Sequence, residues 1–278
     1  MRDLTPITVE TPRFKIEGIS VGGMCTSISV PALNVVLDAG ISAPSMAKGN
    51  SLFFSHFHLD HVGGLGTYLG IRDLRRNSSN LYCLEGQSRA CADLVSSFRS
   101  LSETDLKVAV HGVGFGESIK YDTGLYAKPF RTLHRVPSAG WLFSRKKNKL
   151  KPEFLGMDHK DIANLRKSGT AITETVISNE LAYATDTKLE GVLACEEALT
   201  ADTLILECTY VCKDFTVAEA RNRCHVHLDE IIMNAEKFQN KNIVLMHFSN
   251  RYDRDTIIKT VSKRVPAEWL HGKLQWLV

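Results

Sequence analysis

The sequence predicts an α/β domain, because strand-like and helical segments alternate along 278 residues of ordinary globular composition. Hydrophobic residues make up 44% of the chain and charged residues 23%, a balance that allows a sizeable buried core. The length lies within the range of one α/β sandwich or barrel. We therefore expect residues 1–278 to form a single domain.

Short runs rich in β-branched and apolar residues, bounded by Gly, Pro or Asn, indicate strands. In chain order these runs are Phe14–Ile16, Asn34–Leu37, Leu52–Phe54, Leu81–Leu84, Leu125–Thr132, Trp141–Phe143, Leu181–Thr185, Thr203–Leu206 and Ile243–Met246.

Helices are predicted where apolar residues recur at three- and four-residue spacing. These segments are Gln87–Ser97, Asp158–Lys167, Leu228–Phe238 and Asp253–Ser262. In the third segment the apolar residues form one stripe, which is typical of a helix that packs on a core.

The net charge of +3 is mildly basic, which suits an anionic substrate without requiring one. No window approaches the roughly 18 apolar residues of a membrane span, and the N-terminus lacks a signal-peptide pattern. Seven cysteines without a CxxC pair favour reduced thiols. We expect no membrane partner and a cytoplasmic location, with the nucleus or an organelle as alternatives.

The segment from Arg145 to Ser168 concentrates positive charge. Its cations include Arg145, Lys146, Lys147, Lys149 and Lys151, followed by a short helix that ends in Arg166 and Lys167. A solvated charge run is the usual interpretation of such a segment. The alternative is a surface that holds phosphates, which needs cations gathered on one face.

The run from Ser55 to His61 places four metal-type ligands, His56, His58, Asp60 and His61, within six residues. Such spacing does not fit one helix face and suits a loop at the end of a strand. The preceding apolar run supplies that strand, and the glycine pair after His61 permits a sharp exit. Imidazole and carboxylate ligands together favour a divalent cation such as Zn²⁺.

Two four-coordinate sites need more ligands than this run supplies. His134, Asp186 and His247 each follow a predicted strand, where side chains from neighbouring strands converge. A single histidine in such a place is more often a hydrogen-bonded structural residue. Three such residues in addition to the first run favour ligands instead.

The motifs resemble a known family. SHFHLDH at Ser55–His61 is similar to the signature of the metallo-β-lactamase superfamily. HFSNRY at His247–Tyr252 resembles the HFSxRY segment of tRNase Z, the segment Glu207–Thr209 resembles the end of its HEAT motif, and Thr185–Thr187 resembles its GDT turn. The order holds from about Ser20 to Tyr252, and the likeness is to the short, plant-type form.

This resemblance implies an αββα four-layer sandwich with two mixed β-sheets and two zinc ions. His56, His58 and His134 would hold one ion, and Asp60, His61 and His247 the other, with Asp186 bridging them. Asp60 would also orient the nucleophile or accept its proton. Glu207 and His225 would form an acid pair that protonates a leaving ribose 5′-oxygen, and Thr187, Thr209 and Arg251 would contact phosphate.

The implied activity is that of an endoribonuclease that removes the 3′ trailer from precursor tRNA and leaves a 3′-hydroxyl on the tRNA. A homodimer is implied as well. Residues 145–180 fall where bacterial members insert a tRNA-binding arm, so this segment is a candidate arm of reduced size. No PxKA-type segment occurs near Leu81–Glu85, so rejection of CCA-ended tRNA is not predicted.

Other interpretations stay open at this stage. One is a hydrolase of small phosphodiesters or esters on the same fold, and another is a non-catalytic RNA-binding scaffold. Leu206, Thr185 and Val226 depart from the family pattern without removing a ligand. The role of His227, catalytic or structural, is undecided.

Overall fold

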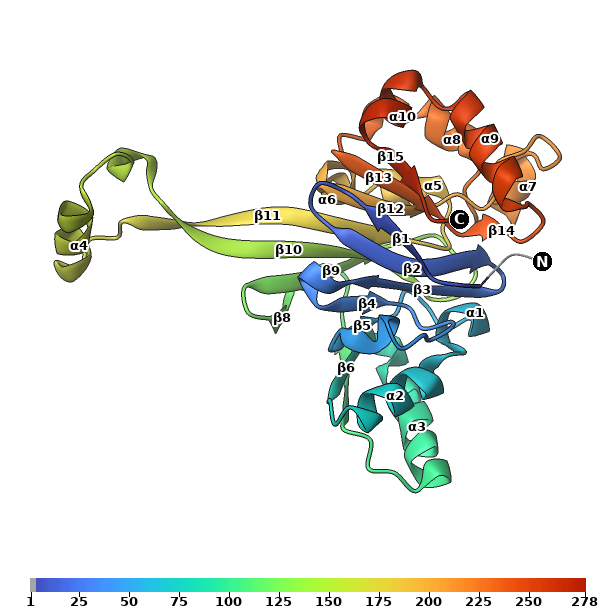
Figure 1. Cartoon of the computed structure of the whole chain (residues 1–278), viewed down its shortest axis with the longest axis horizontal. Coiled ribbons are helices and arrows are strands. Elements are labelled where there is room, and N and C mark those ends of the chain that lie inside the picture. The colour runs from blue at the N-terminus through green and yellow to red at the C-terminus, as the bar shows by residue number, and fades with distance from the viewer. Residues whose placement is uncertain (1–3) are drawn as a thin grey trace.

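The strands of the computed structural model, which describes residues 4–278, form two mixed sheets that pack face to face between two layers of helices (Figure 1). This αββα arrangement confirms the predicted fold class. The layers have a simple physical origin, because each sheet buries one face against the other sheet and one face against helices.

The first sheet runs in the order β1-β2-β3-β4-β5-β6-β7, with β14 beside β2. Its strands are β1 (Ile7–Glu10), β2 (Lys15–Gly22), β3 (Cys25–Val30), β4 (Val35–Leu37), β5 (Ser51–Phe53), β6 (Ser79–Leu84), β7 (Val108–Val113) and β14 (Phe248–Ser249). Helices α2 (Leu65–Leu74) and α3 (Glu85–Ser102) pack on its outer face, and α1 (Leu59–Val62) lies at its edge near β3.

The second sheet runs in the order β15-β13-β12-β11-β10-β9-β8. Its strands are β8 (Ile119–Asp122), β9 (Leu125–Arg131), β10 (Ala139–Leu150), β11 (Thr173–Ala184), β12 (Thr203–Glu207), β13 (Asn242–Met246) and β15 (Leu274–Trp276). Its outer helices are α5 (Leu189–Leu193), α6 (Glu196–Thr200), α7 (Val217–Asn222), α8 (Leu228–Met233), α9 (Arg254–Arg264) and α10 (Ala267–Gly272). Short 3₁₀ turns occupy Pro31–Leu33, Met46–Lys48, Pro152–Phe154 and Ala235–Lys237.

Side chains that alternate between the two faces of the central strands form three apolar layers, one between the sheets and one under each layer of helices. Phe53 of β5 packs in the core between the sheets, whereas its neighbours Leu52 and Phe54 pack under α2 and α3. In the same way Phe143 of β10 faces the inner core and Leu142 faces the outer helices of the second sheet. These strands therefore appear in the sequence as continuous apolar runs, which is typical of strands buried on both faces.

The sequence patterns failed where polar residues are buried or apolar residues are exposed. Strand β3 carries Thr26, Ser27 and Ser29 in buried positions, where hydroxyl groups are partly satisfied by contacts such as that of Ser27 with the carbonyl of Asp38. The predicted helix Leu228–Phe238 was too long, because α8 ends at Met233. The Asn234 side chain bonds back to the Glu230 carbonyl there, which competes with further helix.

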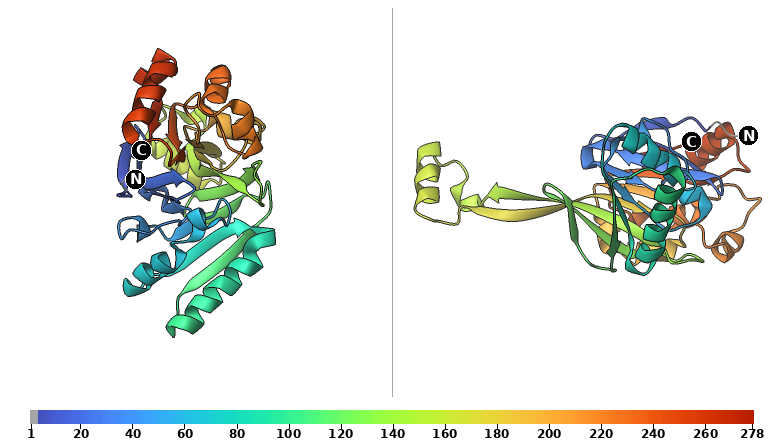
Figure 2. Two further views of the ribbon diagram at one scale, coloured as in Figure 1. Left: turned by 90° about the vertical axis from the view of Figure 1, so that its right-hand side faces the viewer. Right: turned by 90° about the horizontal axis from the view of Figure 1, so that it is seen from below.

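The greatest difference lies between Trp141 and Thr185. Strands β10 and β11 continue well beyond the predicted runs and pair as a long hairpin, with α4 (His159–Lys167) near its tip. The hairpin projects from the sandwich in Figure 1 and in the right-hand view of Figure 2. Strand propensities do not predict these lysine-rich extensions, because lysine is depleted in ordinary half-buried strands.

None of the helices in residues 4–278 combines the length and the apolar character that crossing a membrane requires.

Candidate metal centre

The predicted ligands come from four strand ends that meet at one edge of the sandwich. The run from Ser55 to His61 follows β5, His134 follows β9, Asp186 follows β11 and His247 follows β13. Asp186 and His247 have left-handed backbone torsions, with φ of 46° and 60°. Such torsions turn the chain sharply after a strand and are common at functional sites.

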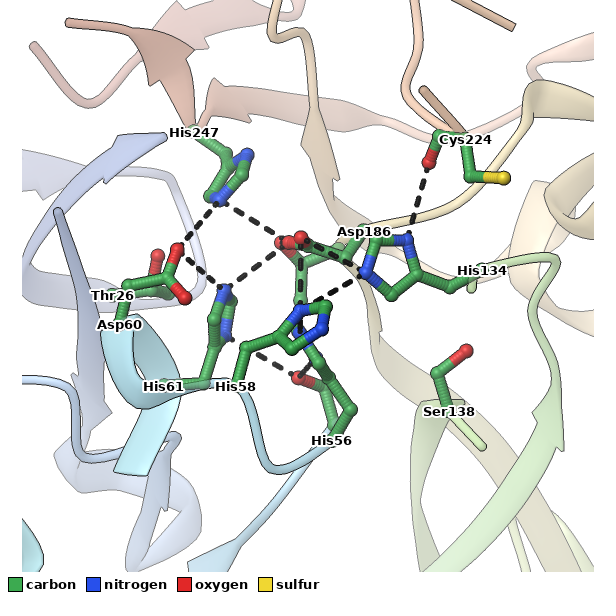
Figure 3. Close-up of polar contacts among 12 residues, drawn as sticks. Thr26, His56, His58, Asp60, His61, His134, Ser138, Asp186, Cys224 and His247 are labelled. Atoms are coloured by element: carbon green, nitrogen blue, oxygen red, sulfur yellow. Dashed lines mark hydrogen bonds and ion pairs between the residues drawn. The ribbon is translucent and has the colours of Figure 1, made fainter. Parts of the chain in front are cut away.

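The first ligand cluster consists of His56, His58, His134 and Asp186, whose ligand atoms all lie within 4.8 Å of one another. Nδ1 of His58 lies 3.0 Å from Nε2 of His56 and 3.2 Å from Nε2 of His134. Oδ2 of Asp186 lies 3.8 Å and 3.6 Å from those two Nε2 atoms (Figure 3). Four ligands held about 2.1 Å from a tetrahedral centre stand roughly 3.4 Å apart, so these spacings fit one Zn²⁺.

The second ligand cluster consists of Asp60, His61 and His247, with the other oxygen of Asp186 beside it. Oδ1 of Asp186 lies 3.2 Å from Nε2 of His61 and 3.2 Å from Nε2 of His247. Oδ2 of Asp60 lies 3.6 Å from the first of these nitrogens and 4.0 Å from the second. Asp186 thus faces both clusters, one oxygen to each (Figure 3).

Two buried nitrogen atoms of the second cluster are suited to bind a cation. Nε2 of His61 and Nε2 of His247 have no hydrogen-bond partner among the described residues, although both residues are buried. An unsatisfied polar atom in such a place costs free energy unless something binds it. A divalent cation between these nitrogens and the carboxylates would satisfy them.

The ionisation states of His56 and Asp186 also suit metal binding, which needs neutral imidazole and ionised carboxylate. Burial, together with the neighbouring His61, lowers the pKa of His56 to about 2, so its ring is neutral. Burial acts to raise the pKa of Asp186, but the facing rings of His247 and His61 hold that pKa well below its usual range. The Asp186 carboxylate is therefore ionised at neutral pH.

The outer nitrogen of most ligand rings is held by a second group. Nδ1 of His61 lies 2.8 Å from Oδ2 of Asp38, a fully buried residue that also accepts bonds from the Ser55 amide and hydroxyl and from the Tyr183 hydroxyl. Nδ1 of His56 lies 3.0 Å from the Ser55 hydroxyl. Sequence reasoning missed Asp38, although it follows the predicted strand Asn34–Leu37 just as Asp186 and His247 follow theirs.

We expect Asp38→Asn to weaken metal binding about 10- to 100-fold, the usual cost of losing a carboxylate that orients a ligand imidazole. The change keeps the shape of the side chain and removes its charge. Competition against a zinc chelator of known affinity measures the effect. Unchanged affinity, with the folded state intact by circular dichroism, would show that the charge of Asp38 does not support the metal site.

Glu207 and His225 form a pair beside the two clusters. Nδ1 of His225 lies 3.2 Å from each carboxylate oxygen of Glu207, which is fully buried. Burial alone would lower the pKa of His225, but the Glu207 carboxylate outweighs it and raises that pKa to about 9. A protonated imidazole next to a metal cluster is suited to give a proton to a leaving group.

The ligand set leaves one ambiguity at His225. Ligand atoms of Asp186, His225 and His247 also lie within 4.8 Å of one another, so this histidine could bind metal itself. The contact with Glu207 raises the pKa of His225, and the protonated ring that this favours is an acid and not a metal ligand.

The hydroxyls of the two threonines expected to contact phosphate hydrogen-bond other groups of the protein. The hydroxyl of Thr187 accepts a bond from the Leu133 amide and donates one to the Lys188 carbonyl. The hydroxyl of Thr209 donates to Glu207 and lies 3.0 Å from Nδ1 of His247. Both residues are buried, and Thr209 lines the cavity beside the clusters; their contact with phosphate stays a prediction.

His227 lies away from both clusters. Its Nδ1 accepts a bond from the Asp229 amide at the start of α8, and its Nε2 lies 3.2 Å from the Cys212 carbonyl. The ring is 1% exposed, and its contacts cap the helix. This geometry favours the structural role over the catalytic one.

The comparisons with known proteins agree with the geometry. Residues 34–248 match the beta-lactamase superfamily domain. Over 264 residues the chain is 35% identical to tRNase Z TRZ1 of Arabidopsis thaliana, and the match covers 94% of each protein. The chain belongs to the tRNase Z family.

Two further relatives support this membership. The chain is 33% identical over 262 residues to the chloroplastic tRNase Z TRZ2 of Arabidopsis thaliana, covering 92% of this chain and 74% of that protein. The crystal structure of human tRNase Z, short form, superposes with a TM-score of 0.58 over 84% of this chain and 92% of that one. Identity to the human chain is 18%, so that likeness concerns the fold.

In this tRNase Z family member the ligand clusters open into a cavity of about 310 Å³ whose rim carries arginines. Arg135 and Arg223 line it, and both were missed from the sequence because neither belongs to a motif. Arg251 lies next to it, its guanidinium carbon 4.8 Å from the Phe215 ring centroid, and Arg223 lies 5.2 Å from the same centroid. Exposed cations around a cavity attract phosphates.

The basic segment divides into two parts. Nε of Arg145 bonds both carboxylate oxygens of Glu180 at the base of the hairpin, at 3.0 and 3.1 Å. Lys146, Lys147, Lys149 and Lys151 lie farther out, on or just after β10. Lys147 and Lys149 have no ion-pair partner within the described residues, whereas Lys151 lies 4.0 Å from Glu153 and Lys146 lies over the Tyr126 ring.

Proposed function

We propose that this chain is a zinc-dependent endoribonuclease that removes the 3′ trailer from precursor tRNA. One phosphodiester bond is hydrolysed, and the tRNA keeps a 3′-hydroxyl. The observation that carries the proposal is the pair of ligand clusters that share Asp186 beside the Glu207–His225 pair, in a member of the tRNase Z family.

The ligand set fits two zinc ions, with His56, His58 and His134 for one, Asp60, His61 and His247 for the other, and Asp186 between them. Two zinc ions supply a nucleophile from water at neutral pH and neutralise charge on the phosphate. Asp60 would orient that water, since its carboxylate lines the cavity and is 16% exposed. Burial acts to raise the pKa of Asp60, but the neighbouring rings of His247 and His61 outweigh it and hold that pKa at about 2.

The leaving oxygen differs from the one that the resemblance implied. A 3′-hydroxyl on the tRNA requires scission of the bond between phosphorus and the 3′-oxygen, so the leaving group is the 3′-oxygen of the last retained nucleotide. The trailer keeps the phosphate at its 5′ end. His225 therefore gives its proton to the tRNA 3′-oxygen, and Glu207 holds the imidazolium in place.

The arginines of the rim complete the substrate site. Arg223 and Arg135 line the cavity, and Arg251 lies over the ring of Tyr210, which also lines it. The guanidinium group suits bidentate contact with phosphate oxygens. We assign them to the phosphodiester backbone on either side of the cleaved bond.

A cleavage assay on precursor tRNA tests the proposal, combined with metal analysis of the purified protein. We expect cleavage at the start of the trailer, with about two zinc ions per chain. Hydrolysis of a chromogenic phosphodiester without cleavage of precursor tRNA would favour a small-molecule hydrolase. A metal-free, inactive chain that still binds RNA would favour a scaffold. A CCA-ended substrate in the same assay shows whether mature ends are rejected.

The projecting hairpin, residues 145–180, is proposed as a tRNA-binding arm. Its exposed lysines and the cations of α4 would contact RNA phosphates beyond the reach of the cavity. We expect replacement of residues 147–175 by a two-residue turn to raise KM for precursor tRNA at least ~100-fold, since several phosphate contacts are lost together. Hydrolysis of a chromogenic phosphodiester should be unchanged, and equal loss on both substrates would contradict the arm's role.

The remaining proposals concern assembly and location. We propose a homodimer, which sedimentation analysis tests directly. We also propose a cytoplasmic location, while noting that one relative is named as chloroplastic.

A further inference from the structure

The base of the arm contains a buried carboxylate that the reaction does not use. Glu180 lies on β11, with only 1% of its side chain exposed. It sits at an irregularity in the pairing of β10 with β11, since Phe143 pairs with Leu181 and the next residue, Ser144, pairs with Asn179. Glu180 is therefore the extra residue of a β-bulge, a feature that bends a strand pair and redirects it.

The bulge lies close to the point where β9 stops pairing with β10. Strand β9 pairs with β10 only as far as Arg145, so farther out β10 and β11 pair with each other alone. A two-stranded ribbon is marginal in water and does not hold its own direction. The direction of the arm must therefore be set at its base.

Two arginines from different parts of the molecule meet at the Glu180 carboxylate. Arg145 reaches it from β10, and Arg13 reaches it from the turn between β1 and β2 of the other sheet. Arg13 also pairs with Asp202, which lies just before β12. A further bond joins the Arg145 guanidinium to the Ala32 carbonyl at 3.4 Å.

We propose that this group of ion pairs, the arm anchor (Arg13, Arg145, Glu180 and Asp202), fixes the direction in which the arm leaves the body. Glu180 is then a positioning residue for precursor tRNA, acting through the arm and far from the metal clusters. The inference rests on the proposed role of the arm. A buried carboxylate shared by two arginines keeps the segments that carry them in a fixed arrangement, because separating one partner would leave the remaining charges uncompensated.

The reaction kinetics test this role. Glu180→Gln keeps the shape and one acceptor oxygen but removes the charge. If the arm then spends about a tenth of its time in the binding direction, KM for precursor tRNA rises about tenfold with little change in kcat. Hydrolysis of a chromogenic phosphodiester should not change. Asp93→Asn, which breaks the exposed Arg89–Asp93 pair on α3, is the matched control and should leave both substrates unaffected.

Hydrogen exchange tests the anchor independently of tRNA cleavage. Amides of residues 146–150 and 173–178 should exchange faster in Glu180→Gln and in Arg13→Gln than in the unaltered chain, and the double variant should show a less than additive change. Arg13 is 36% exposed, so its replacement should leave the fold intact if Glu180→Gln does not fold.

Unchanged exchange in the ribbon, or equal loss on precursor tRNA and the small phosphodiester, would overturn the arm anchor. Failure of the unaltered chain to cleave precursor tRNA would instead overturn the proposed function, and the exchange data would still decide whether Glu180 holds the arm.

Discussion

Replacement of Asp186 by alanine is expected to remove both metal ions and to reduce cleavage of precursor tRNA by at least about 10⁴-fold. The reason is geometric, because the two oxygens of this carboxylate face different clusters. Oδ1 lies 3.2 Å from the Nε2 atoms of His61 and His247, and Oδ2 faces His56 and His134. No other described side chain within the clusters faces both sites in this way.

Metal content by mass spectrometry and single-turnover cleavage measure this effect. Asp186→Asn is the informative companion, because asparagine tolerates the left-handed backbone at this position and removes only the charge. Asp105→Ala, at an exposed position distant from the ligands, serves as the control. Two bound ions and normal cleavage in Asp186→Asn would remove Asp186 from the metal site.

Replacement of His225 by alanine should leave the metal content unchanged and slow the chemical step about 10²- to 10⁴-fold, the usual contribution of a general acid. Its imidazole contacts both oxygens of Glu207, which keeps it protonated near neutral pH. Loss of a metal ion in this variant would show that His225 is a ligand, as its closeness to Asp186 and His247 allows. Normal cleavage would refute the acid assignment.

The pH profile supplies a second test of the same pair. The raised pKa of His225, about 9, means that the acid form is present below that pH and is lost as pH rises through it. Bound zinc would lower this value, since nearby positive charge disfavours an imidazolium. Glu207→Gln removes the opposing charge, so the alkaline fall in kcat should move to lower pH. A profile unaffected by Glu207→Gln would contradict the coupling.

Much of the fold and the ligand set followed from local pattern. Strands such as β5 and β13 are covered on both faces, so their apolar runs and bounding polar residues were visible in the sequence. The same logic of a polar residue after a strand located His134, Asp186 and His247. Applied without exception, it would also have found Asp38.

Other features could not be found in this way, because their partners are distant in the chain. The hydroxyls of Thr187 and Thr209, which the resemblance assigns to phosphate, also hydrogen-bond distant groups of the protein. Arg145 looked like one more cation of a basic run, yet it pairs with Glu180. The sequence shows that a residue is charged, but not which group its side chain contacts.

The sequence by itself was enough to predict a metal site and to indicate the family, because ligand types and their spacing after strands are local properties of the chain. Only the tertiary structure decided which groups meet. It brought both oxygens of Asp186 to separate clusters, joined Glu207 to His225, and set Arg13 and Arg145 on one buried carboxylate. These contacts join segments far apart in the chain, and such proximity arises only when the two sheets pack.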